Sequence, residues 1–365
     1  MSKSRCSNGF KCLTMLILCF VIFTSAEVFA QKTISTGVPF LLIGPNSRFS
    51  AMGETGTAIA DDATAMHWNP AGLAFQTENT EINFTHSPWL AGLNISDLFY
   101  DYLAAKKHIE PINGTVGLSL TYLNIGTIIN TDEFGNRLGE YKAYEFALAL
   151  GYATKVTTDL GLGINARFIY SNLSSVSVGN EKGSGTAFTT SFDIAGLYKF
   201  SKGPGIIKDK LSLGLNLSNL GPKISYVDAD QADPIPTQFR LGIAYKLFKN
   251  EGNDLTLTAD FAKLLVNRPD EFYEAIFTSW KGGPSEIAKS FQSSIGAEYW
   301  YGSPKLIALR AGYFYEDPEY GARKYITLGA GIRYSLYGFD FSYISTIEDN
   351  HPLANTLRFG FVINF

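Results

Sequence analysis

Residues 355–365, at the C-terminal end of the chain, read NTLRFGFVINF. One side of this stretch carries only large apolar residues: Leu357, Phe359, Phe361, Ile363 and Phe365. The positions between them carry Thr, Arg, Gly, Val and Asn. Because successive side chains of a β-strand point to opposite faces, this alternation predicts one strand with two unlike faces. It fits a membrane barrel, with apolar residues toward lipid and polar residues toward the lumen, or the half-buried strand of a soluble sandwich.

The same alternation recurs from residue 81 onward and predicts fourteen strands. They lie at about 81–86, 97–107, 112–124, 142–155, 158–172, 186–200, 209–219, 237–248, 253–265, 291–302, 304–316, 323–336, 337–347 and 355–365. All but the first are longer than the roughly five or six residues of an ordinary strand. About nine to eleven residues are needed to cross a bilayer at a tilt, so the lengths favour an all-β transmembrane barrel over residues 81–365.

The links between these strands alternate in length. Short links fall near 108–111, 156–157, 201–208, 249–252 and Ser303, whereas long ones fall at 125–141, 173–185, 220–236 and 266–290. Outer-membrane barrels have short turns on the periplasmic side and longer loops outside. The alternation therefore predicts an antiparallel up-and-down barrel in the cell outer membrane, with both termini in the periplasm.

Charged residues within the strands test this prediction independently, because a charge facing lipid near the midplane costs about 2–4 kcal/mol. Ten charges share the side of their strands that carries Gly, Ser, Thr and Asn: Glu145, Arg167, Asp193, Arg240, Asp260, Glu298, Arg310, Arg333, Asp340 and Arg358. Five are positive and five negative, which predicts a lumen crossed by ion pairs. A soluble barrel or sandwich with its polar face outward stays the alternative.

Residues 1–30 have the pattern of a secretory signal peptide. Three basic residues precede an apolar run over 13–24, and small residues before Gln31 suit cleavage there. An uncleaved anchor helix is the alternative. All three cysteines lie in this segment, so the exported chain has no thiol for disulfides, zinc fingers or a cysteine nucleophile.

Overall composition excludes further classes of protein. The 365 residues are 45% hydrophobic and only 18% charged, with a formal net charge of −4 and no basic block. That balance argues against disorder, a coiled coil and a nucleic-acid binder. The four histidines have no partners at metal-ligand spacing, and no Ser/His/Asp triad is recognisable, so neither a metal, a cofactor nor an enzymatic activity is expected.

Residues 31–80 do not alternate and are rich in Gly, Pro and Asp turn signals. A short helix is expected over 63–68, capped by Asp61 or Asp62 and ended by Pro70. We expect this segment to fold into the lumen as a hatch, a loose periplasmic tail being the alternative.

The hatch segment also resembles a known family. The stretches that carry the resemblance are Leu42-Ile43-Gly44-Pro45-Asn46-Ser47-Arg48, Ala51-Met52-Gly53, Asp61-Asp62-Ala63 and Trp68-Asn69-Pro70-Ala71. They resemble the N-terminus of the PorV/PorQ family, most closely PorV. These are outer-membrane proteins of the type IX secretion system, related in fold to the FadL fatty-acid transporters. Further similarity at Pro88-Trp89-Leu90, Tyr144-Glu145-Phe146-Ala147 and Arg240-Leu241-Gly242 extends the resemblance over most of the chain.

The resemblance implies a non-enzymatic role in protein secretion. Such a barrel would bind the C-terminal signal domain of secreted cargo and shuttle it from the outer-membrane translocon to an attachment complex with a PorU-like sortase. The alternative is a FadL-like transporter of long-chain fatty acids or other hydrophobic compounds.

Two outer links carry candidate binding residues. The link 266–290 places Phe272, Ile276 and Trp280 at helical spacing, with Tyr273 and Phe277 beside them. Such an apolar stripe either packs back onto the barrel mouth or docks cargo or a membrane partner. Trp89 and Leu90, in the first outer link, are the second candidate.

Overall fold

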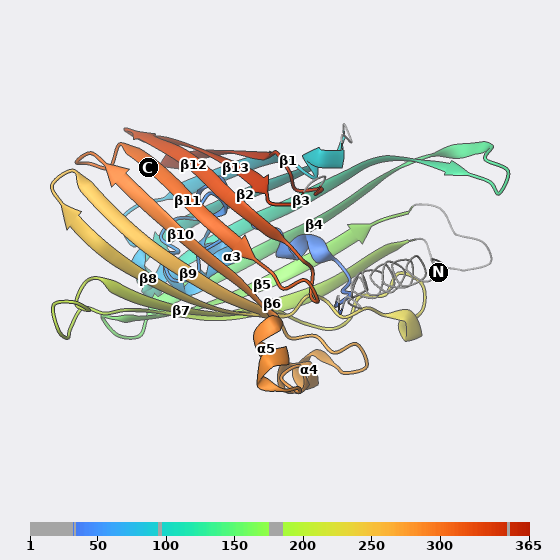
Figure 1. The fold of residues 1–365 in the computed structure, drawn as a ribbon, viewed down its shortest axis with the longest axis horizontal. Coiled ribbons are helices and arrows are strands. Elements are labelled where there is room, and N and C mark those ends of the chain that lie inside the picture. The colour runs from blue at the N-terminus through green and yellow to red at the C-terminus, as the bar shows by residue number, and fades with distance from the viewer. Residues whose placement is uncertain (1–31, 33, 94–96, 175–184, 349–350) are drawn as a thin grey trace, which may run out of the picture.

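The computed structural model describes residues 32, 34–93, 97–174, 185–348 and 351–365. The predicted signal peptide lies outside these residues. Fourteen antiparallel strands follow one another around a closed barrel, in which the first strand pairs with the last (Figure 1). The strands are β1 Glu81–Pro88, β2 Phe99–Ile109, β3 Gly114–Thr131, β4 Arg137–Lys155, β5 Leu160–Asn172, β6 Thr186–Lys199, β7 Leu211–Leu220, β8 Gln238–Asn250, β9 Asn253–Leu264, β10 Phe291–Tyr301, β11 Ile307–Tyr315, β12 Lys324–Tyr334, β13 Tyr337–Thr346 and β14 Thr356–Asn364. The predicted fourteen-stranded barrel is confirmed, and its closure excludes a sandwich.

The two ends of the barrel differ in the links they carry. One end, the short-turn end, holds the start of β1, the end of β14 and the tight connections such as 250–253. The other, the long-link end, holds the connections between β5 and β6, β7 and β8, and β9 and β10.

The prediction of a long link at 125–141 is wrong. Most of 125–141 is strand, because β3 and β4 continue as a hairpin up to the turn at 132–136. A register shift between Asn124 and Gly126, where Gly126 has φ of 99°, interrupts the sequence alternation without ending the ladder. β2 pairs with β3 only up to Asn124, and β5 pairs with β4 only from Tyr144. The outer part of the hairpin therefore projects beyond the wall (Figure 1), and within the described ranges neither of its edges pairs with another strand.

Burial alternates along the strands as the two faces require. In β6, for example, Phe192 and Ile194 are exposed outward, whereas Ser191, Asp193 and Ala195 are buried. The predicted inward charges form ion pairs across the wall. Arg310 contacts Glu298 at 2.9 Å and Asp340 at 2.8 Å, Arg333 contacts Asp340 at 2.6 Å, and Arg167 contacts Asp193 at 2.8 Å. Glu145 differs, since its partner is the hydroxyl of Ser171, which donates at 2.7 Å. The buried carboxylates and guanidiniums thus neutralise one another without facing lipid.

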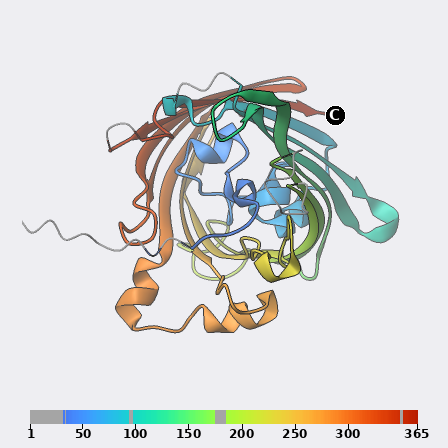
Figure 2. The same ribbon diagram turned by 90° about the vertical axis from the view of Figure 1, so that its right-hand side faces the viewer.

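The described chain from residue 34 to residue 80 enters the barrel and runs through its inside (Figure 2). Its short helices are η1 Pro39–Leu42, α2 Ser47–Ser50, α3 Ala65–Trp68 and η2 Pro70–Phe75. The helix expected over 63–68 begins two residues later, and its N-cap is Thr64 rather than an aspartate. Asp62 instead stabilises the turn that precedes the helix, because its carboxylate accepts a hydrogen bond from Thr64 N at 2.9 Å. Pro70 opens η2, so the helix ends before it as expected.

We predicted that both termini lie in the periplasm, but in the described part of the chain Lys32 and Phe365 lie at opposite ends of the barrel. Lys32 N donates to Glu319 O, which lies in the link between β11 and β12 at the long-link end. Phe365 N donates to Thr80 O at the opposite end (Figure 1). The hatch segment has to cross the length of the lumen before it joins β1, which separates the two ends. Only the barrel's own first and last strands meet at one side.

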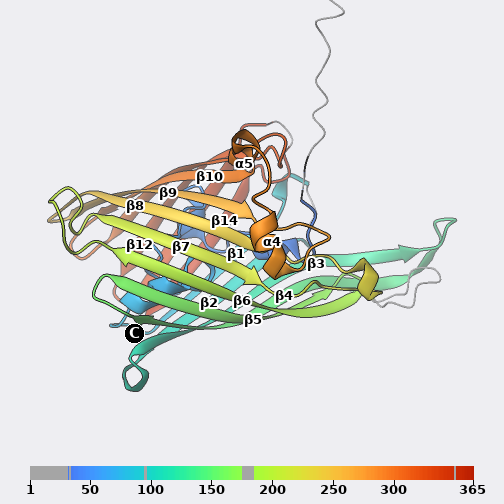
Figure 3. The ribbon, with the colours of Figure 1, turned by 90° about the horizontal axis from the view of Figure 1, so that it is seen from below.

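The remaining helices lie in the links. They are η3 Ala91–Leu93, η4 Glu110–Ile112, η5 Ala229–Gln231, α4 Phe272–Thr278 and α5 Pro284–Lys289. Both α4 and α5 sit outside the ring of strands, beside the wall (Figures 2 and 3). Within the described ranges, no helix has the length and apolar character of a membrane span.

Candidate functional site: the filled lumen and the outer helices

Glycines of the wall let the hatch backbone lie directly against the strands. A Cβ added to Gly312 in β11 would stand 2.1 Å from Gly53 N, and one added to Gly53 would stand 2.7 Å from Tyr313 O. Gly53 also has φ of 69°, which a side chain disfavours. Gly214 and Gly296 face Thr57 O and Met52 O at 2.1 and 2.4 Å in the same way. The hatch therefore fills the space beside these small inward-facing residues, and no open channel remains between the described residues at this level.

Replacing Gly312 with alanine tests this packing. We expect Gly312→Ala to destabilise the hatch-filled barrel by about 1–3 kcal/mol, because the new methyl group overlaps the hatch backbone. The temperature at which the folded barrel loses its compact migration on a denaturing gel measures the effect. Gly196→Ala is the matched control, since its Cβ would meet only Leu162 at 3.7 Å. Equal melting of the two variants would contradict the close approach.

Asp260 of β9 holds the middle of the hatch. Its Oδ2 accepts hydrogen bonds from Gly56 N at 3.0 Å, Thr57 N at 3.0 Å and the Thr57 hydroxyl at 2.6 Å. Charge-assisted bonds of this kind are about twice as strong as neutral ones. The wall carboxylate therefore fixes the backbone of the hatch as well as its side chains.

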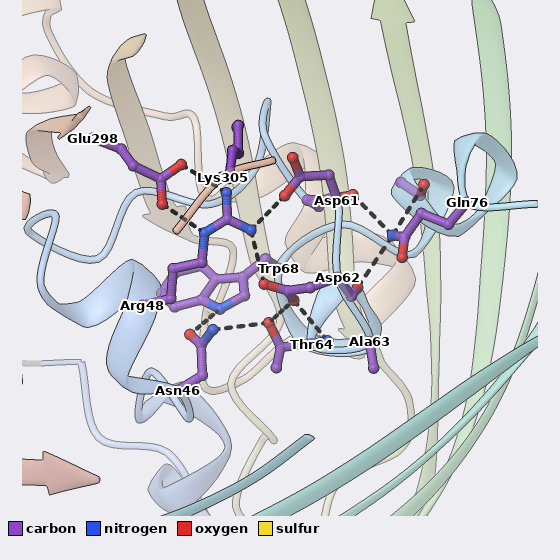
Figure 4. A network of polar contacts seen from close by, with 12 residues as sticks. Asn46, Arg48, Asp61, Asp62, Ala63, Thr64, Trp68, Gln76, Glu298 and Lys305 are labelled. Atoms are coloured by element: carbon purple, nitrogen blue, oxygen red, sulfur yellow. Dashed lines mark hydrogen bonds and ion pairs between the residues drawn. The ribbon is translucent and has the colours of Figure 1, made fainter. Parts of the chain in front are cut away.

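Arg48 of α2 is the centre of a second polar network (Figure 4). Its Nε and Nη2 donate to the two carboxylate oxygens of Glu298 on β10, each at 2.8 Å. Its Nη1 donates to Asp62 at 3.0 Å and to Asp61. Glu298 in turn accepts from Arg310, which continues the network into the wall. Arg48 is only 7% exposed, so this bidentate pair works in a water-poor environment and locks the hatch to the barrel.

The other residues that the sequence placed in the hatch also lie in the lumen. The Trp68 indole is fully buried, donates to Asn46 Oδ1 at 3.0 Å and lies 4.9 Å from the Arg240 guanidinium. Asn69 donates to Thr57 O at 2.7 Å, and its Oδ1 accepts from Ala71 N at 3.1 Å. Sequence reasoning named Asp61, Asp62, Trp68, Asn69 and Pro70, but it missed Arg48 as the residue that links them to the wall.

Trp89 and Leu90 are not on a free surface. Trp89 packs against Tyr100, with ring centroids 6.2 Å apart, and the Arg358 guanidinium lies 5.7 Å from its ring. Leu90 packs against a buried cluster that includes Phe314 and Tyr325. Both residues therefore help to close the long-link end over the hatch.

Trp280 holds the α4–α5 link against the outside of the wall. Its ring packs edge-on to Phe239 at 5.7 Å and against Phe291 at 6.0 Å. Lys263, on the outward face of β9, lies with its Nζ 5.6 Å from the Trp280 ring and is only 4% exposed. The link thus covers a charge that would otherwise face outward. The prediction of one helical stripe is wrong for Trp280, because α4 ends at Thr278.

The remaining predicted residues of this link divide between two faces of α4. Ala275 is buried, and Phe272 and Ile276 are half-buried beside it. Tyr273 and Phe277 point away and are 55% and 76% exposed. These two side chains, here termed the aromatic face of α4, are the exposed part of the predicted binding stripe.

Polar contacts keep α4 ordered although it has only seven residues. Glu271 and Glu274 form a capping box at its start. Asp270 accepts from the Thr278 hydroxyl at its end and from Asn267 at 2.7 Å. Both hydrogen bonds lower the pKa of Asp270 below its ordinary value, and the bond from Thr278 has the larger effect. The aromatic face is therefore presented on a preorganised helix, which reduces the entropy lost on binding.

The lumen charges around Glu298, Arg310 and Asp340 pair with one another. Among the described residues no cluster of three His, Cys, Asp or Glu side chains is placed to hold a metal ion.

Comparisons with known proteins agree with this arrangement. No curated protein sequence matches the chain. Among solved structures, the toluene transporter TodX of Pseudomonas putida is similar, with a TM-score of 0.52, 13% identity and coverage of 88% of this chain and 96% of that one. The toluene transporter TbuX of Ralstonia pickettii gives a TM-score of 0.48 at 14% identity, covering 87% and 97%. A FadL homologue of Pseudomonas aeruginosa gives 0.47 at 12% identity, covering 92% and 99%.

The likeness to TodX confirms the fold, a closed barrel of fourteen antiparallel strands. The family model described as type IX secretion system protein PorV matches residues 26–271, which is more than half of the chain. The matched range includes the hatch with Arg48, the wall strands from β1 to β9 and the start of the link that carries α4. The chain belongs to the PorV family of the type IX secretion system, whose members are non-enzymatic outer-membrane barrels.

Proposed function

We propose that this protein binds the C-terminal signal domain of secreted cargo at its long-link end and shuttles it from the translocon to the surface-attachment complex. The observation that carries the proposal is a lumen filled and locked by the hatch, combined with an exposed, ordered aromatic helix outside the wall. A filled barrel serves as an anchor, and its outer links serve as the binding surface.

The proposed orientation places the short-turn end in the periplasm and the long-link end outside the cell. Short periplasmic turns and longer outer loops are the rule for such barrels. In this orientation Phe365 is periplasmic, and Lys32, where the described chain begins, lies at the outer face with the hatch running inward from it.

The aromatic face of α4 suits a partner that stands beside the barrel. Both α4 and α5 lie outside the circumference of the strands, so a neighbouring membrane protein such as the translocon can reach Tyr273 and Phe277 (Figure 2). Aromatic residues are enriched among those that dominate binding energy at interfaces. The projecting β3–β4 hairpin adds a second surface at this end, with Phe134 81% exposed at its turn. We place cargo and the PorU-like sortase of the attachment complex at this same end.

Transport of hydrophobic compounds is the second candidate, supported by the likeness to the toluene transporter TodX. Such transport needs an apolar route past the hatch. The contacts between hatch and wall are instead polar at Asp260, Glu298 and Arg358, so the hatch would have to release several buried charged hydrogen bonds. We therefore rank secretion first.

Deletion of the gene separates the two functions. We expect proteins with the C-terminal secretion signal to accumulate in the periplasm and to disappear from the cell surface, measured by proteomics of both fractions. Restoring the intact gene is the control. A deletion strain that keeps normal surface proteins and loses only uptake of hydrophobic compounds would contradict the shuttle and support the second candidate.

A further inference from the structure

The short-turn end of the lumen holds a charged vestibule below the hatch. It consists of two adjoining cavities of about 480 and 390 Å³, which share the lining residues Arg48, Asp61 and Lys305. Sites for specific ligands have volumes of about 300–1,000 Å³. The vestibule is therefore large enough for a defined ligand, and the locked hatch closes it toward the other end of the barrel.

Four lysines of the larger cavity form no ion pair with a described residue, although the carboxylates of Asp61 and Asp209 line the same cavity. They are Lys199 at the end of β6, Lys210 just before β7, and Lys246 and Lys249 in β8. No ion pair within the described part of the chain includes any of them. The other cations of the cavity are already paired, Arg48 with Asp61, Asp62 and Glu298, and Lys305 with Asp254 at 3.4 Å. The larger cavity consequently presents an excess of positive charge, with six basic side chains against the four acids Asp61, Asp209, Asp254 and Glu298.

An apolar shelf lies beside these lysines. Phe75 at the end of η2 lines the cavity together with Ile59 and Phe200. The Lys199 and Lys155 ammonium groups stand 4.6 and 5.2 Å from the Phe75 ring. The attraction between these cations and the Phe75 ring holds the two lysine side chains beside the apolar shelf.

Positive charge continues from the cavity onto the connection between β6 and β7. That connection contains Lys202 and Lys208 in addition to the lining residues Lys199 and Lys210, against the single acid Asp209. This basic area extends beyond the cavity, whereas a small anion would contact only basic groups inside it. Headgroups of the surrounding bilayer lie outside the barrel, whereas this cavity lies inside the ring of strands. Size and position together favour a protein segment over a lipid.

We propose that the vestibule binds an acidic peptide segment of a periplasmic protein, with its carboxylates on Lys199, Lys210, Lys246 and Lys249 and an apolar side chain against Phe75. The site is separate from the cargo-binding surface of the proposed function, although the periplasmic source of its ligand rests on the orientation proposed there. Complementary charge of this kind raises the rate of association and selects partners more than it adds affinity.

Binding of a short fluorescent oligoglutamate peptide to the full-length barrel in detergent tests the proposal. We expect saturable binding that weakens as salt rises, because the Debye length falls to about 8 Å at physiological ionic strength. The double variant Lys210→Glu/Lys246→Glu should weaken binding by about tenfold or more. These two residues are adjacent, since Lys246 N donates to Lys210 O at 2.8 Å.

The matched control is Lys142→Glu/Lys281→Glu, which makes the same change in net charge at the long-link end and should bind like the parent. Compact migration on unheated gels shows that each variant is folded. Equal weakening by both pairs, or no saturable binding, would overturn the proposal. Displacement of the peptide by an equimolar amount of inorganic phosphate would also overturn it, because the site would then be one for small anions. Neither result depends on the surface and periplasmic proteomes of the deletion strain, so this test and that of the proposed function fail separately.

Discussion

Arg48→Ala is expected to release the hatch while the strands still close into a barrel. The substitution removes the common partner of Asp61, which is exposed, and of Asp62 and Glu298, which are buried. Removing one member of a buried ion pair costs about 3–5 kcal/mol where the remaining charge is left uncompensated. Arg310 still pairs with Glu298 at 2.9 Å, so we expect the lower part of this range. We expect a lower unfolding midpoint in urea and new protease cleavage within residues 32–80.

Two further variants sharpen this test. Arg48→Lys keeps the charge but loses the bidentate fork on Glu298, so it should restore only part of the stability. Arg137→Ala removes an arginine from an exposed pair with Glu140 on the projecting hairpin and should cost at most about 1 kcal/mol. If the hatch of Arg48→Ala stays as resistant to protease as that of Arg137→Ala, Arg48 is not the lock.

Tyr273→Ser/Phe277→Ser is expected to abolish co-purification of the translocon while the barrel still assembles. Truncating an aromatic residue at the centre of an interface costs about 2 kcal/mol or more, so the double variant should weaken the complex far more than tenfold. Trp280 stays in place on Phe239 and Phe291, which keeps the α4–α5 link on the wall. Affinity purification followed by quantitative mass spectrometry measures the loss.

The control for this prediction is Ile206→Ser. Ile206 is 69% exposed, similar to Phe277, but it lies in the link between β6 and β7 at the short-turn end. Its loss should leave the translocon complex intact. An undiminished complex with the double variant would show that the aromatic face of α4 contacts lipid instead of protein.

Local periodicity was enough to predict the wall. Each strand shows its two faces within about ten residues, because lipid and lumen act on alternate side chains of the same segment. The inward position of charges such as Arg310 and Asp340 followed from the same rule. The rule failed at 125–141, where the bulge at Gly126 shifts the alternation by one residue although the hairpin continues.

The candidate site was only partly predictable. Lys199 and Lys246 occupy inward-facing positions of β6 and β8, so the alternation contained their signal. Lys249 joins them only through the register shift between Lys246 and Phe248, and the gathering of four lysines around one cavity requires the closed ring. The direction of the aromatic face likewise depends on how Trp280 seats α4 on the wall. Neither relation is local in sequence.

The sequence by itself determined the number of strands, the side of each that meets lipid, and the presence of a non-alternating segment ahead of the barrel. Only the tertiary structure decided that Arg48 meets Glu298, 250 residues away, and that Gly53 lies against Gly312. The physical reason is that alternation reflects the surroundings of one strand, whereas these contacts depend on barrel closure and on the register of every strand between them. A shift of one residue in the pairing of β10 would turn Glu298 toward lipid and leave the hatch without its lock.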